Sequence, residues 1–346
     1  MSTHIEKQTG SEAREESLSI EVTTRCNSNC AHCFARVRNS ADADLSAHLV
    51  KEIVLEGYNE AYRHLHITGG EPLLWDGLLE LLDYVFDIGY YTVFLNTNGT
   101  LLTKDISKRL AAYDGLSISV SLEWSQVFHD NLRGKDSYCR AVDGIETALT
   151  AGLNLYVFTT ACKSLLPNLP YFADALYNKY SSIKHLILIQ LFNLRGDGFA
   201  YSNEILEPRK FIQLVRMVAL LNLYGLRISL MNNPLAGVAA NLMKMPWLQP
   251  SLPLYRNGSL IIMANRDMRL SHSSKDSFAR YEFGKIQKVI VSEVYQKAVA
   301  PNQSICPLCE YFGICQKNGM VRPPEGYWNT NVKGLYCKSV LDIVAP

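Results

Sequence analysis

Two hydrophobic patterns alternate over the first two thirds of the chain. Short apolar runs, typical of buried strands, are followed by segments whose apolar residues recur at helical spacing. The expected strands are 19–23, 64–68, 91–95, 116–122, 153–160 and 185–192. The expected helices are 45–62, 74–88, 104–113, 137–151, 169–180 and 208–224. Six strand–helix units with short connections predict an α/β fold, a parallel sheet with helices outside it.

The rhythm changes past Arg227. Prolines at positions 234, 246, 250 and 253 interrupt the chain. Segments 255–263 and 267–271 predict a β-hairpin that turns at Ala264 and Asn265, and a helix is expected at 289–299. We therefore predict three parts: a disordered tail (1–16), a core (17–230) and a small cysteine-rich C-terminal extension (231–346).

Composition and charge exclude several classes of protein. Of 346 residues, 48% are hydrophobic and 19% charged, as in ordinary globular proteins. The net charge is +1 without a long basic run, which argues against nucleic-acid binding. No apolar stretch is long enough to cross a membrane, and the polar first sixteen residues do not resemble a signal peptide. We expect a cytoplasmic protein without membrane partners.

The nine cysteines are distributed unevenly. Seven fall in two groups, and Cys139 and Cys162 stand apart. This layout argues against the disulfide framework of small secreted chains and favours metal ligands. Cys139 and Cys162 are expected as small core residues, with a hydrogen-donating thiol as the alternative.

The first group directly follows the first strand. Cys26, Cys30 and Cys33 are spaced C-x3-C-x2-C, and three thiolates on one tight loop suit an iron–sulfur cluster. A [4Fe-4S] cluster with three protein ligands keeps one iron open to a small molecule. A zinc site, with His32 as a further ligand, and buried structural cysteines are the alternatives.

This pattern resembles the radical S-adenosylmethionine (radical SAM) superfamily. The resemblance implies a partial (β/α)6 barrel and an oxidoreductase in which the amine and carboxylate of SAM chelate the open iron. The reduced cluster then splits SAM into methionine and a 5′-deoxyadenosyl radical, which abstracts a substrate hydrogen atom. It also implies an electron donor such as flavodoxin or ferredoxin.

Two motifs follow the next strands. The second strand ends in Gly69-Gly70-Glu71, where glycines permit close backbone approach and the carboxylate can accept from an ammonium group. After the cysteine loop, this segment resembles the Gly-Gly-Glu motif that holds the methionyl amine of SAM. Segment 96–100, which contains Asn98, is similar to the Thr-Asn-Gly segment that lines the active-site floor. A turn without a ligand remains the alternative for both.

The fourth strand leads into a third motif. Ser-Leu-Glu-Trp at 121–124 and His-Asp-Asn-Leu-Arg-Gly at 129–134 resemble the Ser-Leu-Asp-Gly and His-Asp-x-Ile-Arg-Gly pattern of the peptide-modifying branch. The resemblance implies that Ser121 and Arg133 bind the carboxylate or ribose of SAM. Glu123 and Trp124 depart from the pattern. An alternative role for Trp124 is to cover the substrate pocket. Thr159 and Thr160 end the fifth strand, at the ligand face or as strand-end hydrogen-bonding groups.

The second cysteine group lies in the extension. Cys306, Cys309 and Cys315 are spaced C-x2-C-x5-C, and Cys337 follows 22 positions later. Four thiolates fill a metal site, and a zinc ribbon is one reading. Beside a radical SAM core, the group resembles a SPASM or Twitch extension with an auxiliary [4Fe-4S] cluster. The further cysteines of a full SPASM extension are absent, with Gly319 at one such position, so the resemblance implies one auxiliary cluster.

The substrate is the least constrained prediction. The resemblance favours maturases that crosslink, oxidise or epimerise peptides. Only a short tail precedes Leu18, so a separate leader-peptide-binding protein is an expected partner. A small molecule, such as an amino sugar or cofactor precursor, is the alternative substrate. A non-catalytic iron–sulfur or zinc-binding protein is the third reading, and no catalytic acid or base is assigned.

Overall fold

Ten strands form one sheet, in the order β10-β9-β8-β1-β2-β3-β4-β5-β6-β7. The computed structural model describes residues 13–33, 43–192, 199–231, 234–248, 258–272, 274, 277–300, 306–317 and 336–345. Seven consecutive strands pair in parallel: β1 (Arg14–Glu21), β2 (Tyr62–Thr68), β3 (Thr92–Thr97), β4 (Leu116–Ser121), β5 (Asn154–Ala161), β6 (His185–Gln190) and β7 (Ile228–Met231). The predicted α/β class with a parallel sheet is confirmed.

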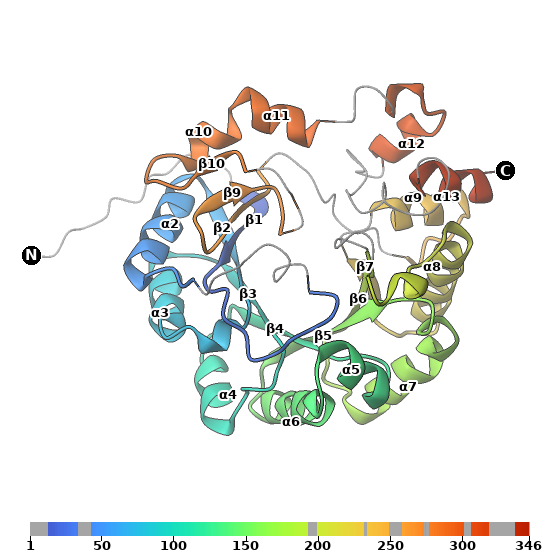
Figure 1. Ribbon diagram of the computed structural model, residues 1–346, viewed down its shortest axis with the longest axis horizontal. Coiled ribbons are helices and arrows are strands. Elements are labelled where there is room, and N and C mark those ends of the chain that lie inside the picture. Colours follow the sequence, from blue (N-terminus) through green and yellow to red (C-terminus); the bar gives the residue numbers. More distant parts are fainter. Residues whose placement is uncertain are drawn as a thin grey trace, which may run out of the picture.

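Helices lie along the outer side of the curved sheet (Figure 1). In the core they are α2 (Ala47–Asn59), α3 (Leu78–Ile88), α4 (Lys104–Leu110), α5 (Gln126–Arg133), α6 (Ser137–Thr150), α7 (Leu169–Lys179) and α8 (Pro208–Leu223). A Cβ atom added to Gly57 of α2 would lie 2.5 Å from Cδ2 of Leu18, so Leu18 faces the helix layer. Because side chains alternate along a strand, Ser19 faces the opposite, concave side.

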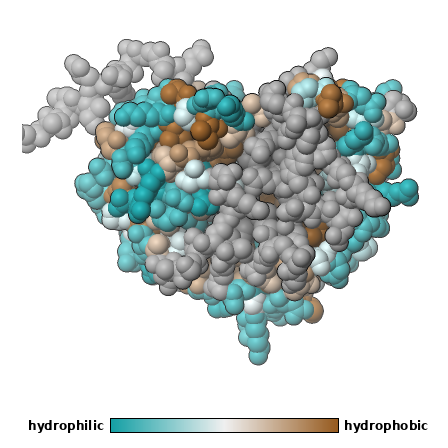
Figure 2. All heavy atoms as spheres, turned by 45° about the horizontal axis from the view of Figure 1, so that its top comes forward, coloured by the Kyte–Doolittle hydropathy of each residue, from teal (hydrophilic) through white to brown (hydrophobic). Residues whose placement is uncertain are grey.

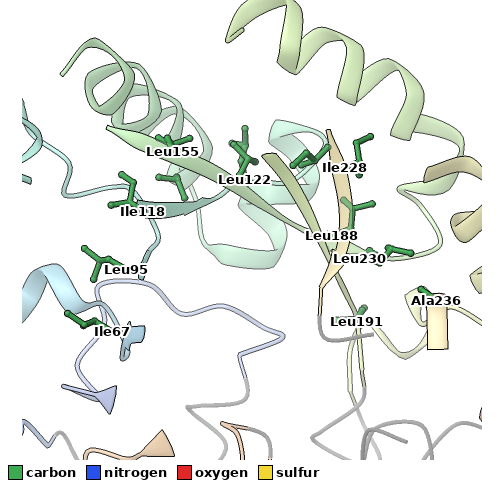
Figure 3. Packing of buried hydrophobic residues seen from close by; sticks show 14 of the residues in the cluster. Ile67, Leu95, Ile118, Leu122, Leu155, Leu188, Leu191, Ile228, Leu230 and Ala236 are labelled. Atoms are coloured by element: carbon green, nitrogen blue, oxygen red, sulfur yellow. The ribbon is translucent and has the colours of Figure 1, made fainter. Parts of the chain in front are cut away.

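The hydrophobic core fills the space between the sheet and its helices. Figure 3 shows buried side chains from successive strands, among them Ile67, Leu95, Ile118, Leu155 and Leu188. Each of these five side chains is 0% exposed. Transfer of such side chains from water contributes about 1.5–3 kcal/mol each. This layer holds the strands in register and therefore fixes where each strand ends.

Several elements were not predicted. Helix α5 follows β4 directly, and β7 and α9 (Pro234–Leu242) follow α8. The single helix predicted at 289–299 is wrong, because α10 (Ile286–Ile290) and α11 (Glu293–Val299) are separated at Ser292, whose side chain accepts from Tyr295 N at 3.3 Å. β1 begins at Arg14, inside the predicted tail, of which residues 1–12 lie outside the described residues. The boundary at 230 falls within β7 and remains a prediction.

The predicted hairpin extends the same sheet. Strands β8 (Leu260–Ile262) and β9 (Asp267–Arg269) are antiparallel, and β8 pairs in parallel with β1. The short strand β10 (Ala279–Arg280) pairs with β9. The predicted positions 255–257 lie outside the described residues. Part of the extension is therefore an addition to the core sheet.

Buried tyrosines fasten the extension to the core. Tyr62 OH donates to Gly258 O at 2.6 Å, and Tyr281 OH donates to Oε2 of the buried Glu56 at 2.8 Å. The last helix, α13 (Tyr336–Val344), begins with a tyrosine whose OH donates to Leu206 O at 2.8 Å. Each hydroxyl thus gains a partner while its ring is buried, as buried tyrosines require.

One face of the molecule is shown in Figure 2. The coloured residues at its rim are mainly hydrophilic, and hydrophobic side chains lie there in small groups. Across the described segments, no helix combines the length and apolarity needed to span a bilayer.

Candidate active site

The three N-terminal cysteines lie on a loop that is fastened to its neighbours through the backbone. Gly70 N donates to Thr23 O at 2.7 Å, and Glu71 N donates to Arg25 O at 2.8 Å. On the other side, Ala31 N donates to Leu132 O at 2.8 Å. The loop is thus attached to the ends of β2 and of α5, and Cys26, Cys30 and Cys33 are all half-buried. Parallel α/β folds bind ligands at this end of the strands.

Gly69 and Gly70 are required by this backbone contact. A Cβ atom on Gly69 would lie 2.7 Å from Thr23 O, and one on Gly70 would lie 2.2 Å from Arg25 O. Neither distance is possible for a carbon atom next to a carbonyl oxygen. The two glycines therefore let the cysteine loop approach the end of β2. This contact within the chain requires glycine at both positions, whether or not a ligand is bound.

Glu71 is completely buried and bound on both oxygens. Its Oε1 accepts from Thr97 Oγ1 at 2.7 Å and from Leu73 N at 3.2 Å, and its Oε2 accepts from Asn98 N at 2.7 Å. Burial raises the pKa of this carboxyl, and the three hydrogen bonds act in the opposite direction. Glu71 thus joins the ends of β2 and β3 beneath the cysteine loop.

Asn98 connects the third strand to the same loop. Its Nδ2 donates to Asn27 Oδ1 at 2.7 Å, and its Oδ1 accepts from Thr100 N at 2.9 Å. Asn27 in turn donates to Thr100 Oγ1 at 2.9 Å. The predicted Thr-Asn-Gly segment therefore lies against the cysteine loop and holds the residue that follows Cys26.

Glu123 and Arg133 form a buried ion pair beyond β4. Arg133 donates to Glu123 Oε1 from Nε at 2.9 Å and from Nη2 at 2.7 Å, and the two side chains are 12% and 0% exposed. Thr160 donates to the same carboxylate from its amide and from its hydroxyl, both at 2.9 Å. The sequence predicted Arg133 but interpreted Glu123 only as a departure from a pattern. The predicted Ser121 ends β4, half-buried.

Helix α5 positions both members of this pair. Ser125 caps the helix by accepting from Phe128 N at 3.2 Å. One turn on, Nδ1 of the buried His129 accepts from Glu123 N at 3.2 Å, and burial lowers the pKa of His129 to about 3. His129 is therefore neutral and acts as an acceptor. The motif residues that the sequence suggested as ligands thus also form a capped helix.

The remaining single residues have distinct surroundings. Cys139 is exposed and Cys162 is buried, so only the second is a core residue. Thr159 Oγ1 donates to Leu122 O at 2.6 Å, so this threonine acts as a hydrogen-bonding group at the end of its strand. The indole N–H of Trp124 is buried and finds no hydrogen-bond acceptor within the part of the chain that the structure describes.

The donor set of the loop fits an iron–sulfur cluster. Burial raises the pKa of Cys26 to about 11 and raises that of Cys30, against which the charge of Arg133 acts. Iron held by these cysteines would replace the thiol protons and so overcome this preference for the neutral form. Among the described residues, no three Cys, His, Asp or Glu side chains are placed to hold a single metal ion.

Three of the four C-terminal cysteines lie in short elements, and Cys309 directly follows the first of them. Cys306 begins a 3-10 turn (Cys306–Leu308), Cys315 lies in α12 (Phe312–Lys317), and Cys337 lies in α13. Burial raises the pKa of Cys315 to about 12, and the charges of Cys309, Cys337 and Cys306 also raise it. The set fits an auxiliary cluster. The predicted position Gly319 lies outside the described residues.

A polar row on the concave face of the sheet was not predicted. His66 Nδ1 contacts Ser19 Oγ at 3.2 Å, its Nε2 contacts Asn96 Nδ2 at 2.9 Å, and Ser119 Oγ donates to Asn96 Oδ1 at 2.8 Å. Burial lowers the pKa of His66 to about 4. The His272 ring, from the extension, lies 6.0 Å away. Barrel interiors are usually packed with branched apolar residues, so this row marks a polar interior. The sequence signal that could have revealed this row was the presence of polar residues within four apolar strands.

Comparison with known proteins found a family model that matches part of the chain. Residues 20–169 match the model of the Radical SAM superfamily. A segment of 136 residues is 32% identical to mycofactocin maturase MftC of Mycolicibacterium smegmatis, covering 39% of this chain and 34% of the relative. A segment of 149 residues is 34% identical to AdoMet-dependent heme synthase of Methanosarcina barkeri, covering 42% of each. The chain thus spans less than half the length of these relatives.

Solved structures extend the likeness to most of the chain. A structure of anSMEcpe with bound AdoMet and Cp18Cys peptide superposes with a TM-score of 0.70 at 15% identity, over 94% of this chain and 96% of the other. A structure of Streptococcus suis SuiB bound to precursor peptide SuiA gives 0.66 at 14% identity, over 86% and 70%. At these identities the likeness shows the shared fold.

Proposed function

We propose that this chain, whose residues 20–169 match the Radical SAM superfamily, is a radical SAM oxidoreductase that matures a peptide. Cys26, Cys30 and Cys33 would hold the [4Fe-4S] cluster that binds SAM, and together these two groups supply a 5′-deoxyadenosyl radical. The observation that carries the proposal is the cysteine loop, which is fixed by backbone hydrogen bonds to the ends of β2 and α5. A loop held in this way keeps its three cysteines on a fixed backbone.

Neighbouring residues would bind SAM. Gly69, Gly70 and Glu71 would meet its methionyl amine, and Ser121 and Arg133 its carboxylate or ribose. Within the described residues Nη1 of Arg133 makes no hydrogen bond, so part of the guanidinium remains for a ligand beside Glu123. Asn98 would act through Asn27 of the cysteine loop. These residues orient the cofactor and exclude water.

The C-terminal cysteines would hold one auxiliary [4Fe-4S] cluster. Cys337 directly follows Tyr336, which accepts from Nε2 of Gln190, the last residue of β6, at 3.1 Å. The second group is therefore tied to the same end of the sheet as the cysteine loop. We propose that the substrate lies between the two groups, with Trp124 along the pocket.

A peptide is favoured by the relatives and neighbours. MftC is named a maturase, and two of the structural neighbours were solved with peptides. The proposed reaction is a crosslink, an oxidation or an epimerisation, with flavodoxin or ferredoxin as electron donor, in the cytoplasm. A separate leader-peptide-binding protein remains a proposed partner. A small-molecule substrate is the second candidate, because AdoMet-dependent heme synthase is as similar as MftC over a like segment.

Iron content and SAM cleavage test the proposal. After anaerobic reconstitution we expect about eight irons per chain, from two four-iron clusters. With a chemical reductant, the protein should convert SAM to 5′-deoxyadenosine. Cys26→Ala should abolish cleavage, whereas Cys139→Ser, at an exposed thiol outside both groups, should leave it unchanged. Equal activity of the two variants, or stoichiometric zinc, would contradict the assignment.

A second measurement separates the substrates. Short open reading frames next to the gene would be co-expressed with the enzyme, and the peptides analysed by mass spectrometry. A mass change that disappears with Cys26→Ala supports peptide maturation. Unchanged peptides, together with intact SAM cleavage, favour the small-molecule substrate.

A further inference from the structure

Glu123 and Arg133 form a buried ion pair next to the helix end that contacts the cysteine loop. We infer that Glu123 is a positioning residue that neutralises Arg133 beside the cysteine loop, so that the pair keeps the reduction potential of the cluster lower than an unpaired arginine would. The inference rests on the proposed function, because it takes Cys26, Cys30 and Cys33 to hold a [4Fe-4S] cluster.

Glu123 acts through Arg133 because its own carboxylate is buried and hydrogen-bonded on both oxygens. It accepts four hydrogen bonds at 2.7 to 2.9 Å: Oε1 accepts two from the guanidinium and one from the Thr160 hydroxyl, and Oε2 accepts one from the Thr160 amide. The side chain is also 0% exposed. Its remaining influence on the site is its charge and the position that it gives to Arg133.

Arg133 lies close enough to the cysteines for its charge to act on them. Leu132, the preceding residue, accepts from Ala31 N at 2.8 Å, and Ala31 directly follows Cys30. This backbone contact places Arg133, the next residue of α5, beside the segment that carries Cys30. The Arg133 side chain is only 12% exposed, so water screens its charge weakly.

The sign of the effect follows from charge. A reduced cluster carries one more negative charge than an oxidised one, and charges act strongly where side chains are buried. An unpaired guanidinium beside the sulfurs would stabilise the reduced form and raise the potential. With Glu123 the pair is neutral, and hydrogen bonds and charges around the sulfurs are known determinants of cluster potential.

The test is a redox titration of the full-length, anaerobically reconstituted protein, followed by electron paramagnetic resonance. The signal that changes when SAM is added identifies the N-terminal cluster. Glu123→Gln should raise the potential and Arg133→Gln should lower it, each changing the ratio of reduced to oxidised cluster about tenfold, or 59 mV for one electron. Glu123→Gln/Arg133→Gln should return close to the wild-type value, because a neutral pair is replaced by a neutral pair.

Thr160→Val is the matched control. It removes one hydrogen bond to Glu123 without changing any charge, so the potential should stay at the wild-type value. Opposite shifts in the two single variants distinguish a role of charge from a loss of fold, which would move both in one direction. Shifts of equal sign, or none, in variants that carry the cluster overturn the inference.

Two further outcomes are decisive. If a single variant fails to hold iron, the double variant alone decides, and a tenfold change in its redox ratio overturns the inference. If the wild-type protein itself forms no SAM-sensitive cluster, the proposed function fails, a result that is separate from the outcome for Glu123.

Discussion

Two glutamates with the same burial have different partners at the ends of β2 and β4. Glu71 and Glu123 are both completely buried, and each contacts a segment that is hydrogen-bonded to the cysteine loop. Glu71 accepts only from neutral donors, whereas Glu123 accepts from a guanidinium. The first joins turns of the backbone, and the second compensates a charge. Burial alone therefore does not indicate the role of a carboxylate. The role follows from whether its hydrogen-bond donors are neutral or charged.

The largest expected effect comes from separating the charged pair. Arg133→Met leaves Glu123 as a buried carboxylate without a cation, and removal of one partner from such a pair costs about 3–5 kcal/mol. Denaturant unfolding of the metal-free protein measures the loss. Arg25→Met is the control, because its pair with Asp44 is 37% exposed on both sides and should contribute at most about 1 kcal/mol. Equal losses in the two variants would mean that Glu123 finds another partner.

A smaller loss of stability is expected at the backbone contact near Glu71, the glutamate with neutral hydrogen-bond donors. Gly70→Ala places a Cβ atom against Arg25 O and should cost about 1–3 kcal/mol, as overpacking does. Because Arg25 adjoins Cys26, iron content after reconstitution should fall as well. Gly313→Ala, where a Cβ atom meets nothing within 4 Å, should leave stability and iron content unchanged. Full iron binding by Gly70→Ala would show that the loop can move away.

The smallest expected effect is a pH dependence. The pKa of Glu71 is raised, so between its ordinary value near 4.3 and the raised value the folded protein keeps a proton that the unfolded chain has lost. The free energy of unfolding therefore falls as pH rises through that window, by at most about 1.4 kcal/mol per pH unit. Glu71→Gln should remove this decrease. Unfolding curves of both proteins at several pH values give the difference, and parallel curves would contradict it.

The sequence predicted the fold where the periodicity was simple. The six strand–helix units follow from apolar spacing, and the hairpin at Ala264 follows from its turn residues. Helix α9 was missed because Pro234 was interpreted as a breaker, although proline is favoured in the first turn of a helix. Helix α5 was missed because its residues were considered only as ligands, and the capping Ser125 was overlooked.

The sequence predicted the members of the site but not their partners. The cysteine spacing and the Gly-Gly-Glu motif are local signals, and they identified the loop and the turn beneath it. The contact between Glu123 and Thr160 spans 37 positions, and it depends on the register of β4 against β5. A single sequence does not fix that register, so Glu123 was interpreted as a mere departure from the family pattern.

The hydrogen bonds of the polar row on the concave face run in one donor-to-acceptor order, from Ser119 through Asn96 to His66. Asn96 accepts from Ser119 through Oδ1 and so turns Nδ2 toward His66, and an amide nitrogen can only donate. Nε2 of His66 is then the acceptor, and the single proton of the neutral ring resides on Nδ1, facing Ser19. A serine on β4 thus selects the tautomer of a histidine on β2. Removing that hydroxyl frees the amide to turn over, and the ring proton can then change nitrogen without any movement of the backbone.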